Sequence, residues 1–209
     1  MARNSADIWG KCRARHQHPD QNYSPYTRVT LRLTANYHTH TRLCKHAEGS
    51  PVDYARAALQ AGLVQLGFSD HTPLPDSRWD NVRMSLCELP DYLGAIAAAR
   101  TSVPSLSILA GLECEFLPEY ESFYRDELLG RSELDYLVFA PHWFPHKGSW
   151  VDCFREPLTP AHLRSYARHV VEALSTKLFA FIAHPDLFGF NYLVWDAETE
   201  ACAREISTA

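Results

Sequence analysis

The sequence has few of the features that mark membrane, secreted or nucleic-acid-binding proteins. In its 209 residues, no apolar run approaches the ~20 residues that are needed to span a bilayer. The six cysteines are scattered without a Cys-x-x-Cys pair, and no apolar signal segment opens the chain. We therefore expect free thiols and a cytoplasmic location. The net charge of −5 argues against nucleic acid or an anionic membrane surface as a partner.

Internal repeats and low-complexity segments are also missing, and the composition is that of one globular domain. Apolar residues make up 46% of the chain and charged residues 22%. Residues 1–34 differ from the rest, because basic residues outnumber acidic ones and no regular period precedes the alternating segment 29–33. We expect a loosely ordered extension over 1–34, favouring an adventitious extension over a basic tail for nucleic acid or targeting. The folded domain is expected over 35–209.

From residue 36 onward, short apolar strands alternate with helices. This rhythm predicts an α/β fold whose parallel sheet is buried on both faces. Capping residues support the helix assignments, with Ser50 before Pro51 and Asp196 before the last helix. We expect strands at 36–40, 64–69, 107–112, 134–140 and 178–183, helices at 51–61, 89–100, 119–129, 160–175 and 196–207, and a long aromatic loop before the fourth helix.

Histidine is unusually common, with eleven copies, and it gathers where predicted strands end. His38 and His40 are two residues apart, so in a strand their side chains would share one face. His46 follows on a loop, whereas His162 and His169 lie on a predicted helix and are expected at the surface. The later strand ends carry His71, Glu113, His142 and His184. Parallel α/β folds place their active sites at this edge, so we expect these side chains to converge there.

This set of side chains exceeds what one tetrahedral zinc ion requires, so it predicts two or three metal ions. Imidazole and carboxylate ligands suit Zn, Mn or Fe. A carboxylate between two metals can bridge them, and Glu113 is the expected bridge, with Glu115 behind it or at the surface. Asp70, next to a predicted ligand, is expected to orient a histidine. Such centres favour metal-assisted hydrolysis, with phosphoesters as the favoured substrates.

The segments HTHTRLCKHAEG, GFSDHTPLP, GLECEF, APHWF and AHPDLF occur in this order across residues 36 to about 188. They resemble the polymerase-and-histidinol-phosphatase (PHP) family, and its histidinol-phosphatase branch in particular. The resemblance implies a distorted barrel of seven βα units, of which only about five are visible in this chain. It also implies an Asp-x-His motif near the C-terminus, and no such motif follows His184. We therefore expect a C-terminally truncated family member.

The resemblance further implies how the metal ligands divide among three sites. They would group as His38 with His40 and Glu113, as Glu113 with His142 and His184, and as His46 with His71. It also implies hydrolysis of L-histidinol phosphate to L-histidinol and phosphate in histidine biosynthesis, with Glu113 and His142 acting through a metal-bound hydroxide. The alternatives are another PHP-type phosphoesterase, or an inactive metal-binding fragment that lacks the Asp-x-His ligands.

The loop from Trp143 to Arg155 is the predicted substrate contact. Its basic residues Arg155, Lys147 and His146 are candidates for binding the phosphate, on the basis of charge and position. Its aromatic residues are expected to pack within the loop, although they could also form a wall for an imidazole ring. Cys44 lies inside the first histidine motif, and we interpret it as a small buried residue rather than a nucleophile.

Overall fold

The computed structural model describes residues 33–130 and 132–209. The predicted extension 1–34 and the alternating segment 29–33 lie outside these residues, apart from their last positions. Within the described ranges, no helix has both the length and the apolar character that crossing a bilayer requires.

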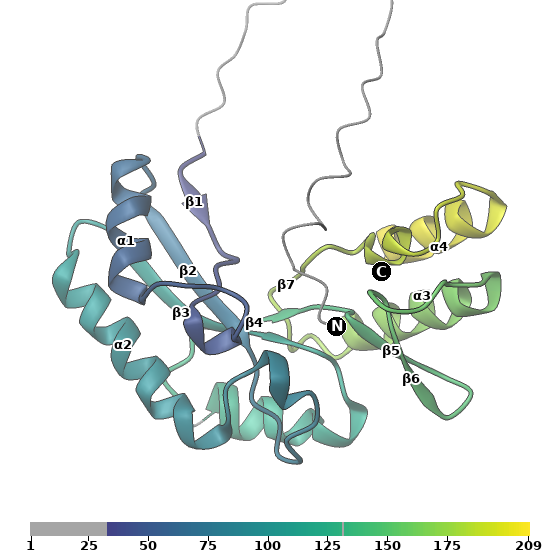
Figure 1. Cartoon of the computed structure of the whole chain (residues 1–209), viewed down its shortest axis with the longest axis horizontal. Helices are drawn as coiled ribbons and strands as arrows, with labels where there is room; N and C mark the ends of the chain where they lie inside the picture. The colour runs from purple at the N-terminus through teal and green to yellow at the C-terminus, as the bar shows by residue number, and fades with distance from the viewer. Residues whose placement is uncertain (1–32, 131) are drawn as a thin grey trace, which may run out of the picture. The chain divides into compact units, whose positions relative to one another are not determined.

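A five-stranded parallel sheet forms the centre of the domain (Figure 1). Neighbouring strands in the sheet follow one another along the chain, as they do in a barrel, and the sheet curls without closing. This arrangement confirms the predicted α/β class and the five parallel strands expected from the βα rhythm. The strands are β1 (Ala35–Asn36), β2 (Gln65–His71), β3 (Ser107–Cys114), β4 (Tyr136–Phe139) and β7 (Phe181–Ile182).

The helices begin where the sequence supplies caps. Ser50 accepts a hydrogen bond from the Asp53 N–H, and the Asp53 carboxylate accepts one from the Ser50 N–H in return. Asp196 caps the last helix in the same reciprocal way with Thr199. The α-helices are α1 (Pro51–Gln60), α2 (Leu89–Ser102), α3 (Pro160–Ser175) and α4 (Ala197–Thr208), as predicted to within two residues. Short 3₁₀ turns are η3 (Arg42–Cys44), η4 (Asp80–Val82), η5 (Leu86–Glu88), η6 (Pro118–Tyr120) and η8 (Leu187–Phe190).

Several predicted elements differ from the structure in detail, and the strand expected at 178–183 is confined to Phe181–Ile182. The helix expected at 119–129 is the η6 turn followed by a π-helix, η7 (Phe123–Leu129). The strand expected at 36–40 ends at Asn36, although the Ser69 N–H still bonds the Thr39 carbonyl at 2.9 Å. The aromatic loop contains an antiparallel hairpin, β5 (Trp143–His146) with β6 (Ser149–Asp152).

The hairpin turn has a sequence signal that the prediction overlooked. Lys147 and Gly148 are the two residues between the strands, and both have positive φ, at 50° and 82°. A two-residue hairpin turn with positive φ at both positions matches the twist of its strands and favours glycine. The Lys-Gly pair is therefore the local cause of the hairpin.

One tyrosine fills the inner side of the curled sheet. Tyr136 reaches from β4 across β3 and β2, and its hydroxyl oxygen lies 2.8 Å from the Tyr37 carbonyl and 3.0 Å from the Phe68 carbonyl, which share its one proton. Two glycines make room for the ring, because a Cβ at Gly67 would lie 2.2 Å from the tyrosine hydroxyl, and one at Gly111 would lie 2.5 Å from the ring. The position of the Tyr136 ring therefore depends on the absence of side chains at these two strand positions.

We predict that Gly111→Ala destabilises the domain by roughly 1–3 kcal/mol, because the new methyl group must displace the Tyr136 ring from a packed position. The matched control is Gly94→Ala on α2, where a Cβ meets nothing within 4 Å. That change should leave stability unchanged or raise it by up to about 1 kcal/mol. Urea unfolding of the three proteins measures both effects, and equal midpoints for Gly111→Ala and the wild type would contradict the prediction.

His169 was predicted at the surface, and the structure corrects this: the side chain is 1% exposed. It lies on α3 among the rings of Phe116, Phe139 and Trp150, at centroid distances of 5.7–5.8 Å. Neither ring nitrogen has a hydrogen-bond partner in the described part of the chain. Burial lowers the pKa of His169 to about 4, because the apolar surroundings disfavour the charged ring.

This buried histidine makes stability depend on pH. Because its folded pKa lies below the ordinary 6.5, protonation favours the unfolded chain. The stability that the neutral His169 ring contributes is fully present above pH 6.5 and is lost as the pH falls toward 4. We predict that His169→Leu recovers up to about 3 kcal/mol of stability between pH 7 and pH 4, relative to the wild type. Urea unfolding at both pH values tests this, with His162→Gln on the same helix as control, and parallel curves for wild type and His169→Leu would contradict it.

Candidate metal centre

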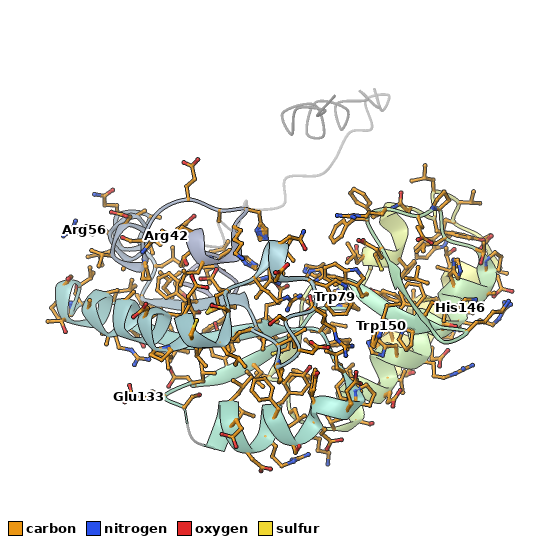
Figure 2. The ribbon with its side chains drawn as sticks, turned by 60° about the horizontal axis from the view of Figure 1, so that its bottom comes forward. Arg42, Arg56, Trp79, Glu133, His146 and Trp150 are labelled. Atoms are coloured by element: carbon orange, nitrogen blue, oxygen red, sulfur yellow. The ribbon has the colours of Figure 1, made fainter. Side chains whose placement is uncertain are left out.

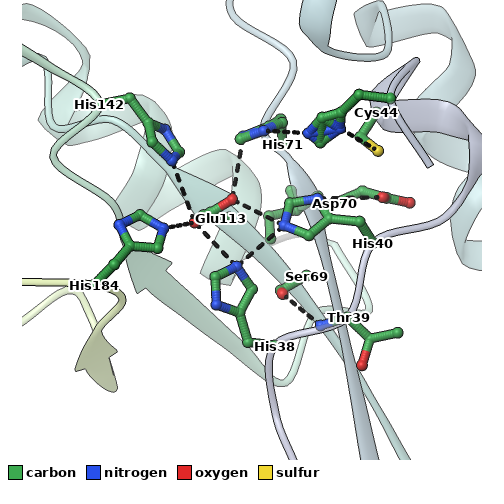
Figure 3. A network of polar contacts seen from close by, with 12 residues as sticks. His38, Thr39, His40, Cys44, Ser69, Asp70, His71, Glu113, His142 and His184 are labelled. Carbon is green, nitrogen blue, oxygen red and sulfur yellow. Dashed lines mark hydrogen bonds and ion pairs between the residues drawn. The ribbon is translucent and has the colours of Figure 1, made fainter. Parts of the chain in front are cut away.

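The predicted ligands converge at the C-terminal edge of the sheet (Figure 3). His71 ends β2 and is paired in register with Glu113 near the end of β3. The segments that follow the other strands bring in the remaining rings. All seven predicted ligands line one open depression: His38, His40, His46, His71, Glu113, His142 and His184.

Glu113 is the centre of this arrangement, with 1% of its surface exposed. Its Oε1 atom lies 3.0 Å from Nε2 of His38 and 3.0 Å from Nε2 of His184. The Nε2 atom of His142 is 3.7 Å from the same oxygen. One carboxylate oxygen thus faces three imidazole nitrogens that come from three different strand ends.

The other oxygen of Glu113 faces the second half of the cluster. Oε2 lies 3.1 Å from Nε2 of His40 and 3.2 Å from Nδ1 of His71. The remaining nitrogen of His71 is 3.2 Å from Nε2 of His46, and the other nitrogen of His46 is 3.0 Å from the Cys44 sulfur. Cys44 is fully buried, as predicted, and it supports a ring of the cluster.

The electrostatics of the cluster favour a bound cation. Burial raises the pKa of Glu113, but the surrounding histidines, His142 foremost, outweigh burial and hold that pKa well below its usual range. Burial lowers the pKa of His71 to about 3, which keeps this ring neutral and free to act as a ligand. Burial also lowers the pKa of His40, but contacts with Cys44 and Glu113 raise it to about 10. A place that attracts a proton this strongly also attracts a metal cation.

The donor atoms fit divalent metal ions. Ring nitrogens face each other closely, with 3.1 Å between Nε2 of His38 and Nε2 of His40. Glu113 Oε2 and one nitrogen each of His71 and His184 are buried without a hydrogen-bond partner among the described residues. Donor atoms within 4.8 Å of one another include the groups His38–His40–Glu113 and Glu113–His142–His184. These are two of the three sites that the sequence predicts, and their occupation by metal stays a prediction.

Asp70 has a different partner from the one expected. It is completely buried and accepts hydrogen bonds from the Thr41 hydroxyl and, at 2.6 Å, from the Thr41 N–H. The nearest histidine nitrogen, Nδ1 of His40, is 3.8 Å away. Burial raises the pKa of Asp70 against the lowering effect of Thr41. Asp70 therefore fixes the backbone between His40 and His46, and it acts on the rings through that loop.

Glu115 holds a ligand from behind. Its side chain is buried, with Oε1 2.9 Å from Nδ1 of His142 and Oε2 2.8 Å from Nη1 of Arg83. Burial raises the pKa of Glu115, but Arg83 and then His142 hold it well below its usual range. The spacing of Glu113 and Glu115 on one strand already placed both on the same face. Arg83 gave no comparable signal, because it lies in the irregular segment before η5.

A cavity of about 540 Å³ opens beside the cluster. Its walls include the indoles of Trp79 and Trp143, which stack at 4.4 Å with an 11° angle between their planes. Trp150 meets Trp79 edge-on at 5.7 Å, and Figure 2 shows these two indoles together. The cavity also touches the metal cluster and several polar side chains: it is lined by His46, His71, His142, Trp79, Trp143, Phe154, Asn81, Val82, Asp152, Arg155 and Glu156.

The predicted phosphate-binding residues divide between two places. Arg155 lines the cavity. Lys147 is exposed at the hairpin turn and is not among the lining residues. His146, labelled in Figure 2, lies 2.9 Å from the Ser165 hydroxyl on α3 and edge-on to His162. Arg155 is thus the one basic side chain of the three that the structure brings to the cavity.

A curled parallel sheet with a histidine-rich centre at its C-terminal edge defines a class of metal-binding α/β proteins, and comparison with known proteins specifies the family. The family model described as "PHP domain" matches residues 36–208. The chain therefore belongs to the PHP domain family.

Curated relatives carry a common name. The chain is 37% identical over 161 residues to "Probable histidinol-phosphatase" of Deinococcus radiodurans, and it is 32% identical over 91 residues to "Histidinol-phosphatase" of Bacillus subtilis. The first alignment covers 72% of this chain and 59% of the relative, and the second covers 40% and 34%. The chain thus spans less than two thirds of the length of either relative.

A solved structure supports the fold. The histidinol phosphate phosphatase of Lactococcus lactis, in complex with zinc, L-histidinol and phosphate, superposes with a TM-score of 0.66 at 17% identity. The match covers 83% of this chain and 67% of the other. At this identity the similarity establishes a shared architecture.

We predict that Glu113→Gln weakens divalent metal binding at least about tenfold, because the amide removes the one negative charge that faces both halves of the cluster. Glu121→Gln is the matched control, since Glu121 is an exposed acid that pairs with Arg125. Zinc titration calorimetry and elemental analysis of the dialysed proteins measure the effect. Equal zinc content and affinity in Glu113→Gln and the wild type would contradict the assignment.

Proposed function

We propose that this protein is a metal-dependent phosphomonoesterase, a histidinol-phosphatase that hydrolyses L-histidinol phosphate to L-histidinol and phosphate in histidine biosynthesis. Two kinds of comparison support this. Curated relatives carry the histidinol-phosphatase name, and the similarly folded Lactococcus lactis protein is described in complex with L-histidinol and phosphate. On this proposal, residues 35–209 form the phosphatase domain, and the protein acts in the cytoplasm on a small molecule.

The observation that carries the proposal is the cavity shared by the metal cluster and the aromatic wall. His46, His71 and His142 belong to both the cluster and the cavity. A flat imidazole ring fits beside indole faces such as those of Trp79 and Trp143. A substrate that joins a phosphate to an imidazole could therefore place its phosphate at the metal cluster and its imidazole ring against the indoles at the same time.

The polar lining suits the other groups of this substrate. The carboxyl groups of Asp152 and Glu156 line the cavity, so either can bind the substrate ammonium group. Arg155 can bind phosphate oxygens, although it also lies 3.3 Å from Asp152, which competes for it. Lys147, at the hairpin turn, remains a second candidate for phosphate.

Within the cluster, the roles follow from position. The seven predicted ligands would hold two or three divalent ions, and zinc, manganese and iron all suit these donor atoms. The predicted ligands are His38, His40, His46, His71, Glu113, His142 and His184. When bound, such ions supply Lewis acidity that activates water and neutralises phosphoryl oxygens. Glu113 would keep the ligand rings together, and Glu115 would hold the Nδ1 proton of His142 so that Nε2 stays free to bind.

A second candidate function is metal binding without catalysis. Residues 185–209 contain no Asp-x-His motif, so this stretch adds no ligand of that kind to the groups around His38 and His46. Another phosphomonoester or nucleotide substrate is the remaining alternative within the hydrolases.

Phosphate release by the zinc- or manganese-loaded protein tests the proposal. We expect L-histidinol phosphate to be hydrolysed in preference to a panel of phosphomonoesters and nucleotides. His38→Ala is the control, and it should lower kcat/KM by about 100-fold or more. Mutation of a residue that only supports a metal ligand already lowers metal affinity or activity by about 10–100-fold, and loss of the ligand itself should cost more. Release at the level of His38→Ala would contradict the enzyme assignment. Preference for another ester would contradict only the substrate.

A further inference from the structure

Arg83 is the largest fully buried side chain of the domain, with 1% of its surface exposed. A buried arginine is rare unless its charge and its donors are matched. Its Nη1 atom donates to the Thr72 carbonyl at 2.7 Å and lies 2.8 Å from Glu115 Oε2. Its Nε atom donates to the Trp79 carbonyl at 3.2 Å. One guanidinium thus contacts a strand end, a carboxylate and a loop.

Arg83 is connected to the metal cluster through Glu115. Glu115 Oε1 lies 2.9 Å from Nδ1 of His142, whose Nε2 faces Glu113. Arg83 and His142 thus contact the two oxygens of one buried carboxylate, so the position of Arg83 fixes where Glu115 meets the His142 ring.

Arg83 is also connected to the aromatic wall of the cavity, through its hydrogen bond to Trp79. Trp79 has a φ of 55°, which is an unusual conformation for a bulky residue and has an energetic cost. The Arg83 bond to its carbonyl holds this conformation, and the guanidinium lies 5.6 Å from the indole centroid. The conformation places the indole against Trp143. Strain of this kind persists where the surrounding structure enforces it.

We propose that Arg83 is a positioning residue that couples the metal ligand His142, through Glu115, to the cavity wall formed by Trp79. Cluster and wall then share one buried cation, so neither can shift without the other. The inference rests on the metal centre of the proposed function and not on the identity of the substrate. It also requires arginine in particular, because the planar guanidinium holds Nη1 beside Glu115 and Nε beside the Trp79 carbonyl at a fixed separation, whereas an ammonium group has only one nitrogen.

The test compares Arg83→Lys with Arg78→Lys. Arg78 is the matched control, because its guanidinium lies 5.9 Å from the same indole but pairs with Asp76 and Glu119 at the surface. We expect Arg83→Lys to weaken zinc binding about 10–100-fold, as loss of a ligand's supporting partner does. It should also reduce the near-ultraviolet circular dichroism of the stacked indoles. Arg78→Lys should change neither signal.

A double-variant cycle separates positioning from a general loss of structure. Arg83→Met alone leaves Glu115 charged and buried, so that variant can fail to fold, whereas Arg83→Met with Glu115→Gln removes both charges. We expect the double variant to bind zinc as weakly as Glu115→Gln alone, because Arg83 acts on His142 only through Glu115. A double variant that binds zinc much more weakly than Glu115→Gln alone would overturn the proposal, because Arg83 would then act on the cluster by a route other than Glu115.

The remaining outcomes are also distinct. Wild-type zinc affinity and an unchanged indole signal in Arg83→Lys, even with a lower melting temperature, would overturn the proposal, because they indicate a merely structural role. A wild-type protein that binds no zinc would overturn both the metal centre and this inference. Zinc binding that depends on Arg83, without hydrolysis of L-histidinol phosphate, would support the inference and contradict only the proposed substrate.

Discussion

The buried carboxylate of Glu113 is the interaction on which the rest of the site depends. Five histidine rings lie within 3.7 Å of its two oxygens, and they come from segments spread over most of the domain. A carboxylate buried this deeply is unfavourable unless positive charge surrounds it. Rings packed this closely would repel one another if several were protonated. Divalent cations would resolve both problems, because they would neutralise the carboxylate and bind neutral imidazoles.

The fold makes this convergence possible through register. In-register pairing of β2 with β3 sets His71 beside Glu113, and the curl of the sheet brings the ends of β1 and β7 to the same place. Next to the cluster, Tyr136 packs against bare backbone at Gly67 and Gly111. Each glycine lies on the same face of its strand as a ligand, His71 on β2 and Glu113 on β3, so an added methyl group would disturb packing on the face that presents these ligands.

The ligands could be predicted from the sequence because they follow short apolar strands, and parallel strands align their ends. Residues that act through tertiary packing had no such signal. Arg83 and Trp79 lie in an irregular segment, and their importance follows only from contacts with Glu115 and the hairpin. His169 shows the opposite error: its helical position fits either face, and only the surrounding rings reveal that it is buried.

The central claim is that the histidines and Glu113 form one multinuclear metal centre. X-ray absorption at the zinc edge of the zinc-loaded protein tests it most directly. The account predicts nitrogen and oxygen neighbours at about 2.0–2.2 Å with imidazole scattering, and a second zinc at roughly 3.5–4 Å. A shell dominated by sulfur at about 2.3 Å would place zinc on cysteine instead, and it would contradict the account. Zinc with no metal neighbour would contradict the shared centre.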